Sequence, residues 1–339
     1  MITDTLNRPL RDLRISVTDR CNFRCTYCMP EEVFGEGYTF LPREDLLTFE
    51  EITRVTRILV RLGAVKVRLT GGEPLLRQEL EKLVAMLAEI DGVDDMAMTT
   101  NAYLLPAKAH LLKDAGLQRV TVSLDTLDDA IFRKMNGRRS GVEKVLAGIA
   151  AAEAAGLTPI KINAVVQRRV NDHTIVDLAR YARERGWIVR FIEYMDVGTL
   201  NGWRMDHVVP ADEIVSIIDA AMPLEELPSN YRGEVARRYR YRDGAPGEIG
   251  LITSVTQPFC GACNRMRLSA EGKMYTCLFA TKGTDLRGPL RDGATDDELE
   301  QIMRGTWSKR TDRYSQIRTE MTDEQREGRE RVQMYHIGG

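Results

Sequence analysis

Short β-rich runs alternate with amphipathic helical stretches along this chain, and this alternation restricts the fold more than any other feature. Six runs are each followed by a helical pattern: residues 13–17, 65–70, 95–99, 120–124, 160–166 and 188–192. Thr48-Phe49-Glu50-Glu51, for example, resembles a capping box, and the apolar pattern behind it ends at Gly63. Such alternation predicts an α/β fold with a parallel sheet, and six units fit a partial (βα)6 TIM-type barrel better than a closed barrel of eight.

The remainder of the chain predicts a small C-terminal α+β extension. We expect a helix over residues 211–221, a linker rich in Pro, Gly and charge over 227–247, a helix over 297–310, and a mobile or solvated segment over 311–331. We therefore divide the chain into a core of residues 1–226 and a C-terminal region of residues 227–339.

Composition limits the functional classes. The formal net charge is −2. Charged residues make up 29% of the chain, and acidic and basic residues are mixed along it. No apolar stretch approaches the ~18 residues that suggest a membrane span. These features predict a cytoplasmic protein that binds neither nucleic acid nor membrane.

All six cysteines fall into two triplets, and none is left over. They are Cys21, Cys25 and Cys28, then Cys260, Cys263 and Cys277. A four-iron cluster is normally held by four thiolates, so a triplet leaves one iron open to a ligand that is not protein. The two triplets therefore predict two [4Fe–4S] clusters, the second of them in the C-terminal extension.

The cysteines could also form disulfides or bind zinc. Disulfides are disfavoured because the N-terminus is polar and a chain of this length needs no covalent staples. Zinc would require a completing ligand such as histidine, and none of the four histidines is near either triplet in sequence. The x3–x2 spacing of the first triplet is uncommon for zinc, whereas the Cys-x2-Cys-x13-Cys spacing of the second leaves zinc open.

Polar residues follow each predicted strand. In order, the strand ends carry the first cysteine triplet, Gly71-Gly72-Glu73-Pro74, Thr99-Thr100-Asn101, Ser123-Leu124-Asp125, Lys161 with Asn163, and Arg190 with Glu193, Tyr194 and Met195. Any one of these could be an ordinary cap. Because active sites of such barrels gather where the strands end, six coinciding polar ends predict one shared site.

These residues resemble a known family. The segment Cys21-Asn22-Phe23-Arg24-Cys25-Thr26-Tyr27-Cys28 is similar to the signature of radical S-adenosylmethionine (SAM) enzymes, and Gly71-Gly72-Glu73-Pro74 resembles their glycine-rich turn. The second triplet, Arg265-Met266-Arg267, Phe191-Ile192-Glu193-Tyr194-Met195-Asp196 and the terminal Gly338-Gly339 narrow the resemblance to the MoaA family of GTP 3′,8-cyclases, over nearly the whole chain. Ala102 departs from the glycine usual in that family, which we expect to alter only the turn.

The resemblance implies a reaction. SAM on the open iron of the first cluster would yield a 5′-deoxyadenosyl radical, which abstracts the C3′ hydrogen of GTP. Attack on C8 and reduction would then give 3′,8-cyclo-7,8-dihydro-GTP, the first step of molybdenum cofactor biosynthesis. The implied enzyme is a lyase that depends on two [4Fe–4S] clusters and SAM.

Individual residues inherit roles from the resemblance. It assigns SAM contacts to Tyr27, Gly72, Ser123 and Met195, and GTP contacts to Arg14, Arg68, Thr99, Lys161, Arg265, Met266 and Arg267. The two arginines stand two apart on an expected strand, so both point to one face, where guanidinium groups suit a triphosphate. Catalytic roles are implied for Arg265 and Arg267, and for Gly338 and Gly339, whose lack of side chains suits a narrow cavity.

The sequence also leads to expectations about binding partners, and it leaves two alternative functions open. The resemblance implies GTP as the small-molecule substrate, an electron donor, a downstream cyclic pyranopterin monophosphate synthase and, as one arrangement, a homodimer. One alternative is a radical SAM enzyme that modifies a peptide or protein, although such enzymes usually carry a longer auxiliary cysteine set. The other is a non-catalytic iron–sulfur or zinc protein.

Overall fold

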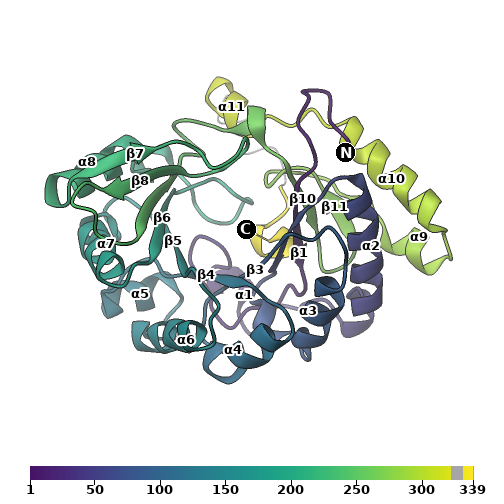
Figure 1. Ribbon diagram of the computed structural model, residues 1–339, viewed down its shortest axis with the longest axis horizontal. Coiled ribbons are helices and arrows are strands. Elements are labelled where there is room, and N and C mark those ends of the chain that lie inside the picture. The colour runs from purple at the N-terminus through teal and green to yellow at the C-terminus, as the bar shows by residue number, and fades with distance from the viewer. Residues whose placement is uncertain (322–330, 339) are drawn as a thin grey trace.

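Eight parallel strands form an open barrel at the centre of the molecule (Figure 1). The structure is a computed structural model that describes residues 1–321 and 331–338. Within these ranges the strands make one sheet in the order β12-β11-β10-β1-β2-β3-β4-β5-β6-β9-β8-β7. No helix in the described ranges is both long and apolar enough to cross a membrane.

The six predicted strands are confirmed, and so is the partial TIM barrel. They are β1 (Asp12–Ser16), β2 (Lys66–Thr70), β3 (Asp95–Thr100), β4 (Arg119–Ser123), β5 (Lys161–Val166) and β6 (Ile188–Glu193). Outside this ring lie α2 (Phe49–Leu62), α3 (Leu80–Ala88), α4 (Leu105–Asp114), α5 (Asp129–Met135), α6 (Val142–Ala154), α7 (Ile175–Glu184) and α8 (Ala211–Ala221) (Figure 1). Shorter helical turns are α1 (Glu31–Phe34), η1 (Arg43–Asp45), η2 (Pro74–Leu76), η3 (Asp172–Thr174) and η4 (Met205–His207).

The first barrel helix shows how local sequence sets these elements. Thr48 caps α2 by accepting from the Glu51 backbone N–H, and the Glu51 side chain accepts from the Thr48 N–H in return. Gly63 ends the helix with φ of 123°, a conformation that glycine adopts freely. The helix buries Ile52, Val55 and other apolar residues between itself and the sheet.

The C-terminal part of the chain joins both edges of the barrel rather than standing apart from it. Its strands are β7 (Leu224–Leu227), β8 (Arg237–Tyr241), β9 (Glu248–Ile252), β10 (Arg265–Leu268), β11 (Lys273–Tyr275) and β12 (Thr284–Asp285). β9 pairs in parallel with β6, and β10 pairs in parallel with β1. The two regions of our sequence division, residues 1–226 and 227–339, therefore share one sheet.

Two local predictions for this part were wrong. The expected linker over 227–247 contains β8, whose arginines pair with acids on neighbouring strands, as Arg238 does with Glu248 at 2.6 Å. The expected mobile segment contains α11 (Tyr314–Ile317) and η6 (Arg318–Glu320), where Tyr314 and Arg318 are buried. Residues 322–330 of that segment lie outside the described ranges.

The remaining helices cover the outside of the extension or enter the barrel. α9 (Arg287–Arg291) and α10 (Asp296–Ser308) lie on the outside beside α2, close to the N-terminus (Figure 1). The short turn η5 (Cys260–Ala262) carries the first cysteine of the second triplet. α13 (Met334–Ile337) contacts β1, and the C-terminal end of the chain lies inside the ring of strands (Figure 1).

The two faces of the barrel strands differ in chemistry. Leu13, Ile15 and their counterparts on the other strands face the helices and make the hydrophobic core. The alternate residues, such as Arg14, Arg68 and Lys161, face inward, because successive side chains of a strand point to opposite faces. TIM-type barrels are usually filled with branched apolar side chains, so this polar interior leaves room for a ligand.

Candidate functional site

A cavity of about 420 Å³ occupies the inside of the barrel. Its walls are the inward faces of the parallel strands and the loops of the C-terminal part, including all three cysteines of the second triplet. Nine basic and five acidic side chains line it, so its balance is positive. The basic residues are Arg14, Lys66, Arg68, Arg119, Lys161, Arg190, Arg265, Arg267 and Arg310.

Three arginines stand side by side on neighbouring strands. The strand register pairs Arg14 of β1 with Arg68 of β2 on one side and with Arg267 of β10 on the other. Burial and the neighbouring guanidinium groups lower the pKa of Arg14 to about 9, and burial is also the main cause that lowers the pKa of Arg68 to about 10. The pKa of Arg267 falls well below its ordinary value, first through burial and then through Arg14 and Arg265.

These side chains also keep donors that other protein groups do not use. Arg68 Nη1 donates to Thr121 Oγ1 at 3.1 Å and lies 3.4 Å from Thr99 Oγ1. Within the described residues, the Nε atoms of Arg14 and Arg68 have no hydrogen-bond partner although they are buried. Since unpaired buried donors are costly, a row of such cations fits a bound polyanion.

Further cations continue this wall around the barrel. Burial, together with Arg190 and Arg119, lowers the pKa of Lys161 to about 7. Arg119 donates to both carboxylate oxygens of Asp95, at 2.6 and 2.7 Å, and this pair holds it at the wall. Arg190 belongs to one of the six polar strand ends that predict the shared site, whereas Arg119 was not predicted; the inward positions of both, on β6 and β4, follow from strand alternation.

The second cysteine triplet closes one side of the cavity. Arg265 Nη2 lies 3.4 Å from Cys263 Sγ, and the Phe279 N–H lies 3.4 Å from Cys277 Sγ. Burial would raise the pKa of Cys263, but Arg265 and Arg310 outweigh it and lower that pKa to about 6. Burial raises the pKa of Cys277 to about 12. A thiolate at Cys263, hydrogen bonds to sulfur and exposure toward the cavity fit the donor set of an iron–sulfur cluster with one open iron.

The first cysteine triplet lies on the loop after β1. The Phe23 N–H lies 3.4 Å from Cys21 Sγ, while Arg24 Nη1 donates to the Cys21 carbonyl at 2.7 Å. Burial raises the pKa of Cys21 to about 12, and it raises those of Cys25 and Cys28 well above their ordinary values. Within the described residues, no group of three or more His, Cys, Asp or Glu side chains is arranged to hold a single metal ion.

The residues predicted to bind SAM have different surroundings. Met195 lines the cavity, whereas Tyr27 donates through its hydroxyl to Asp125 Oδ2 at 2.8 Å. Ser123 ends β4, opposite Asn163 of β5, and its side chain is half-buried. From the sequence we expect Gly72 to allow a ligand to approach. The structure adds a second reason for glycine, because a Cβ at Gly72 would lie 2.2 Å from the Arg20 carbonyl oxygen of the neighbouring loop.

Glu73 belongs to one of the six polar strand ends, but no role of its own was predicted for it. It is buried beside Gly72, and it accepts from the Asn101 N–H at 2.8 Å, the Leu75 N–H at 3.0 Å and the Thr100 hydroxyl at 2.8 Å. Burial raises its pKa to about 7. An acid between Gly72 and Pro74 in a turn that follows a strand was the available signal.

Met266 and Ala102 differ from their expected settings. The Met266 side chain is fully buried in the hydrophobic core on the opposite face of β10, so the structure does not bring it into the cavity with Arg265 and Arg267. Ala102 adopts φ of 64°, a left-handed conformation that favours glycine, and packs against Gly148. Alanine in place of the usual glycine at position 102 therefore affects the turn, as the sequence predicts. It also affects the contact between this turn and α6.

The C-terminal tail reaches the cavity wall. Arg267 Nη1 donates to the Gly338 carbonyl, and Gly338 adopts φ of 70°. A Cβ at Gly338 would lie 2.1 Å from Thr70 Cγ2. Tyr335 contacts Tyr38 through their hydroxyls at 2.8 Å, and it belongs to a small buried cluster with Met29 and Phe34 against which Cys28 packs. The tail thus touches both the first triplet and Arg267, while Gly339 lies outside the described residues.

Comparison with known proteins adds independent information. The Radical SAM superfamily model matches residues 15–182, and the Molybdenum Cofactor Synthesis C model matches residues 187–316. The chain is 54% identical to a GTP 3′,8-cyclase of Acidothermus cellulolyticus over 100% of this chain and 99% of the relative. It is 48% identical to a GTP 3′,8-cyclase of Staphylococcus saprophyticus, with the same coverage of both chains.

A solved structure shares the fold. The crystal structure of Streptococcus suis SuiB bound to the precursor peptide SuiA aligns with a TM-score of 0.62, covering 93% of this chain and 68% of that one. The identity is 16%, so the likeness concerns the fold alone.

Proposed function

Because this chain belongs to the GTP 3′,8-cyclase family of radical SAM enzymes, we propose that its barrel cavity holds GTP between two cluster sites and converts it to 3′,8-cyclo-7,8-dihydro-GTP. This is the first step of molybdenum cofactor biosynthesis. As a radical SAM enzyme, the protein uses SAM and an iron–sulfur cluster. Both relatives carry the name GTP 3′,8-cyclase, which favours this function over the two alternatives, whereas the peptide-bound SuiB structure shares the fold alone.

The single observation that carries the proposal is the row of buried arginines beside the second triplet. Arg14, Arg68 and Arg267 are neighbours by strand register and have pKa values lowered by burial and mutual repulsion. A triphosphate would relieve that repulsion and use their free donors. Lys161 and Thr99 line the same cavity and would complete the contacts to the phosphates.

The second triplet would hold the other end of the nucleotide. Cys260, Cys263 and Cys277, which line the cavity, would carry a second [4Fe–4S] cluster, and an iron without a protein thiolate would be able to bind the guanine base. Arg265 would contact the substrate from the same strand as Arg267. Fixing base and phosphates at opposite ends would orient the ribose between them, which is the main demand of such a reaction.

The first triplet would hold the SAM side of the site. Cys21, Cys25 and Cys28 would carry the first cluster, with Tyr27, Gly72, Ser123 and Met195 around SAM. When bound, SAM and its cluster supply a carbon-centred radical able to take hydrogen from C3′ of GTP. Gly338, whose carbonyl accepts from Arg267, would close the space between the two sites and exclude water from it, and the same role is proposed for Gly339.

Partners beyond GTP are also part of the proposal. An electron donor must deliver reducing equivalents, and a cyclic pyranopterin monophosphate synthase would consume the product. The proposal also includes a homodimer as one arrangement and a location in the cytoplasm.

The test is anaerobic incubation of the reconstituted protein with SAM, GTP and dithionite, followed by identification of the product by mass and NMR. We expect 5′-deoxyadenosine and the cyclic nucleotide in equal amounts. An Arg14→Ala variant should lose GTP turnover, whereas Arg180→Ala, which changes an arginine exposed on α7, should not. Cleavage of SAM without any change in GTP would contradict the proposal.

A further inference from the structure

The N-terminal segment, residues 1–10, contacts the loops that carry the second cysteine triplet. It precedes both matched family models, which begin at residues 15 and 187. Two of its side chains, Asp4 and Arg8, are fully buried and bonded to each other, with Arg8 Nε 2.5 Å from Asp4 Oδ2. A buried charged pair so near the N-terminus needs a reason, because burying charges is costly unless they are paired and hydrogen-bonded.

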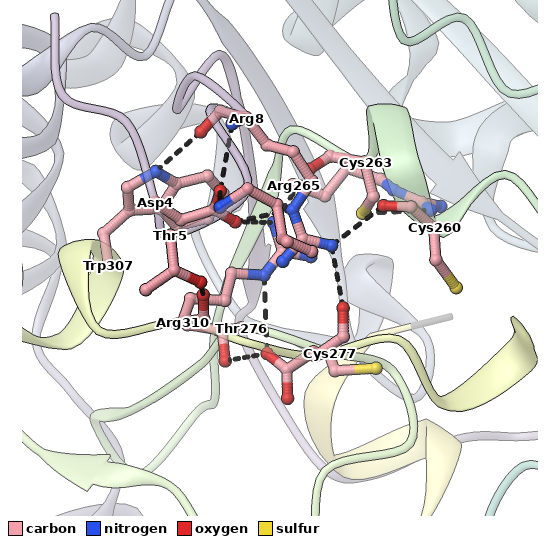
Figure 2. A network of polar contacts seen from close by, with 12 residues as sticks. Asp4, Thr5, Arg8, Cys260, Cys263, Arg265, Thr276, Cys277, Trp307 and Arg310 are labelled. Atoms are coloured by element: carbon pink, nitrogen blue, oxygen red, sulfur yellow. Dashed lines mark hydrogen bonds and ion pairs between the residues drawn. The ribbon is translucent and has the colours of Figure 1, made fainter. Parts of the chain in front are cut away.

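Arg8 holds the first cysteine of the triplet. Its Nη1 donates to the Cys260 carbonyl at 2.8 Å and to the Asp312 carbonyl at 2.7 Å (Figure 2). The Arg8 carbonyl in turn accepts from Trp307 Nε1 at 3.1 Å, which fixes this loop on α10. One guanidinium group therefore joins the N-terminal loop to the main chain of a cluster ligand.

Arg310 holds the second cysteine in the same way. Its Nη1 donates to the Cys263 carbonyl at 2.7 Å and lies 3.5 Å from Asp4 Oδ2 (Figure 2). The Arg310 carbonyl accepts from the Thr5 hydroxyl at 2.6 Å, so the N-terminal loop fixes its backbone as well. The guanidinium also stacks over the Trp307 ring at 4.7 Å, and only 2% of the side chain is exposed.

The third cysteine is reached through its neighbour. Thr276 Oγ1 donates to Asp312 Oδ2 at 2.6 Å, and Arg310 Nε lies 3.4 Å from the same oxygen (Figure 2). Two arginines and two aspartates thus balance in charge, and every cysteine of the triplet is attached to this network directly or through the adjacent residue.

We propose that Asp4, Arg8 and Arg310 are positioning residues of the second cluster, which shape its ligand loops and hold two buried guanidinium groups beside it, with Asp4 and Asp312 as their counter-charges. The proposal rests on the proposed function only in requiring a cluster at the second triplet. Hydrogen-bonded main chain behind metal ligands sets their orientation, and nearby charge is one of the factors that set the potential of an iron–sulfur cluster. The N-terminal segment is then part of the GTP-binding cluster site.

The experiment uses the full-length reconstituted protein and two readouts besides activity. Iron retained against graded chelator measures how firmly the cluster is held, and an EPR-monitored titration gives its midpoint potential. The GTP-sensitive EPR signal assigns the second cluster. In Arg8→Gln and Arg310→Gln we expect that cluster's iron to be held about 10- to 100-fold more weakly, with the first cluster unchanged.

Charge and shape are separated by conservative variants. Arg310→Lys restores the positive charge, so its potential should return toward that of the wild type, whereas Arg310→Gln should be more negative. Arg54→Gln is the matched control, because Arg54 also bonds a carbonyl and an aspartate, those of Ala294 and Asp296, on the outer surface. It should change neither readout.

Each outcome decides. Wild-type iron retention and potential in both glutamine variants would overturn the proposal. If the glutamine variants do not fold, Arg310→Lys and Thr5→Val decide, and failure of all four to fold would reduce the network to a structural role and also overturn it. If the wild type itself lacks a GTP-sensitive cluster signal, the failure belongs to the proposed function instead.

Discussion

The arginines that line this cavity hold their positive charges in a buried site, which is unfavourable. This cost is the basis of their predicted role in binding an anion. Burial lowers the pKa values of Arg14, Arg68 and Arg267, and neighbouring guanidinium groups add repulsion, so these residues favour a bound anion. The stored repulsion should appear as binding free energy when a triphosphate enters. Two residues allow this to be measured.

Arg267→Ala should weaken GTP binding roughly ten- to hundredfold, because each charge-assisted hydrogen bond contributes about 1.5–3 kcal/mol. Arg267→Lys should rescue only part of the loss, since an ammonium group cannot replace the planar fork of a guanidinium. Equilibrium dialysis of GTP with the anaerobic protein gives the affinity. An unchanged dissociation constant in Arg267→Ala would show that the arginine serves the tail rather than the substrate.

Lys161 predicts a pH dependence. Its pKa of about 7 lies below the value of about 10.4 for an unfolded chain, so between these values the unfolded state binds the additional proton. Its effect on folding stability therefore favours the folded state increasingly as pH rises from 7 to about 10. Phosphate binding should reverse the shift, so GTP binding at pH 8 should take up about one proton and weaken as pH rises.

Calorimetry in two buffers of different ionisation enthalpy measures that proton uptake. The uptake should vanish in Lys161→Met and persist in Lys144→Met, which changes an exposed lysine on α6. Equal uptake in the two variants would assign the proton to another group.

At the scale of elements, the periodicity of the sequence predicts the six N-terminal strands and their helices correctly, because each has its own apolar face and end signals. The partners of β9 and β10 were not predictable, since pairing between distant segments leaves no local pattern. β7 and β8 were missed for another reason. Their outer faces carry glutamate and arginine that pair across strands, as Arg240 does with Glu225 at 2.7 Å, and such segments look like linkers.

Some residues of the candidate site could be predicted from the sequence, and others could not. Cysteines and the inward arginines of β10 were predictable from spacing and alternation. The support by Arg8 and Arg310 was not, because it depends on contacts between the two ends of the chain.

The tail offers a prediction at this scale. Gly338→Ala adds a Cβ 2.1 Å from Thr70 Cγ2 at a positive φ, which costs of order 1–2 kcal/mol in backbone strain alone, so the tail should leave its place. GTP cyclisation should then fall about as far as after deletion of Gly338 and Gly339, while SAM binding and iron content remain. Product formation measures this.

A second substitution separates steric from chemical causes. Thr70→Ser removes the colliding methyl group, so the double variant should recover part of the activity. Gly305→Ala is the control, because a Cβ at this position in α10 meets nothing within 4 Å. Full activity in Gly338→Ala would mean that the tail is not part of the site.

The whole molecule is one sheet built from both ends of the chain, which predicts the behaviour of a fragment. Residues 1–226 alone would leave β1 without β10 and β6 without β9, and open strand edges favour aggregation. We expect the fragment to form aggregates on size-exclusion chromatography and coexpressed residues 227–339 to restore a complex that elutes like the intact protein. A monomeric fragment that binds SAM would show that the core folds by itself.

Iron content tests the two-cluster arrangement of the whole chain. The reconstituted protein should hold about eight irons, and Cys260→Ser, Cys263→Ser or Cys277→Ser should lose about half of them while SAM cleavage persists in part. Iron and zinc analysis gives the count. Zinc at the second triplet, or a full iron load in these variants, would contradict it.

The pairing of β1 with β10 also imposes an order on biosynthesis. β1 is among the first segments to leave the ribosome, and its neighbour Arg265–Leu268 is among the last. At 5–20 residues per second, translation leaves β1 without this partner for roughly 10 to 50 s. Cys260 and Cys263 emerge just before β10, and Arg8 can bond the Cys260 carbonyl only then. The proposed second cluster could therefore be assembled only after nearly complete translation, whereas the first triplet is available from the start.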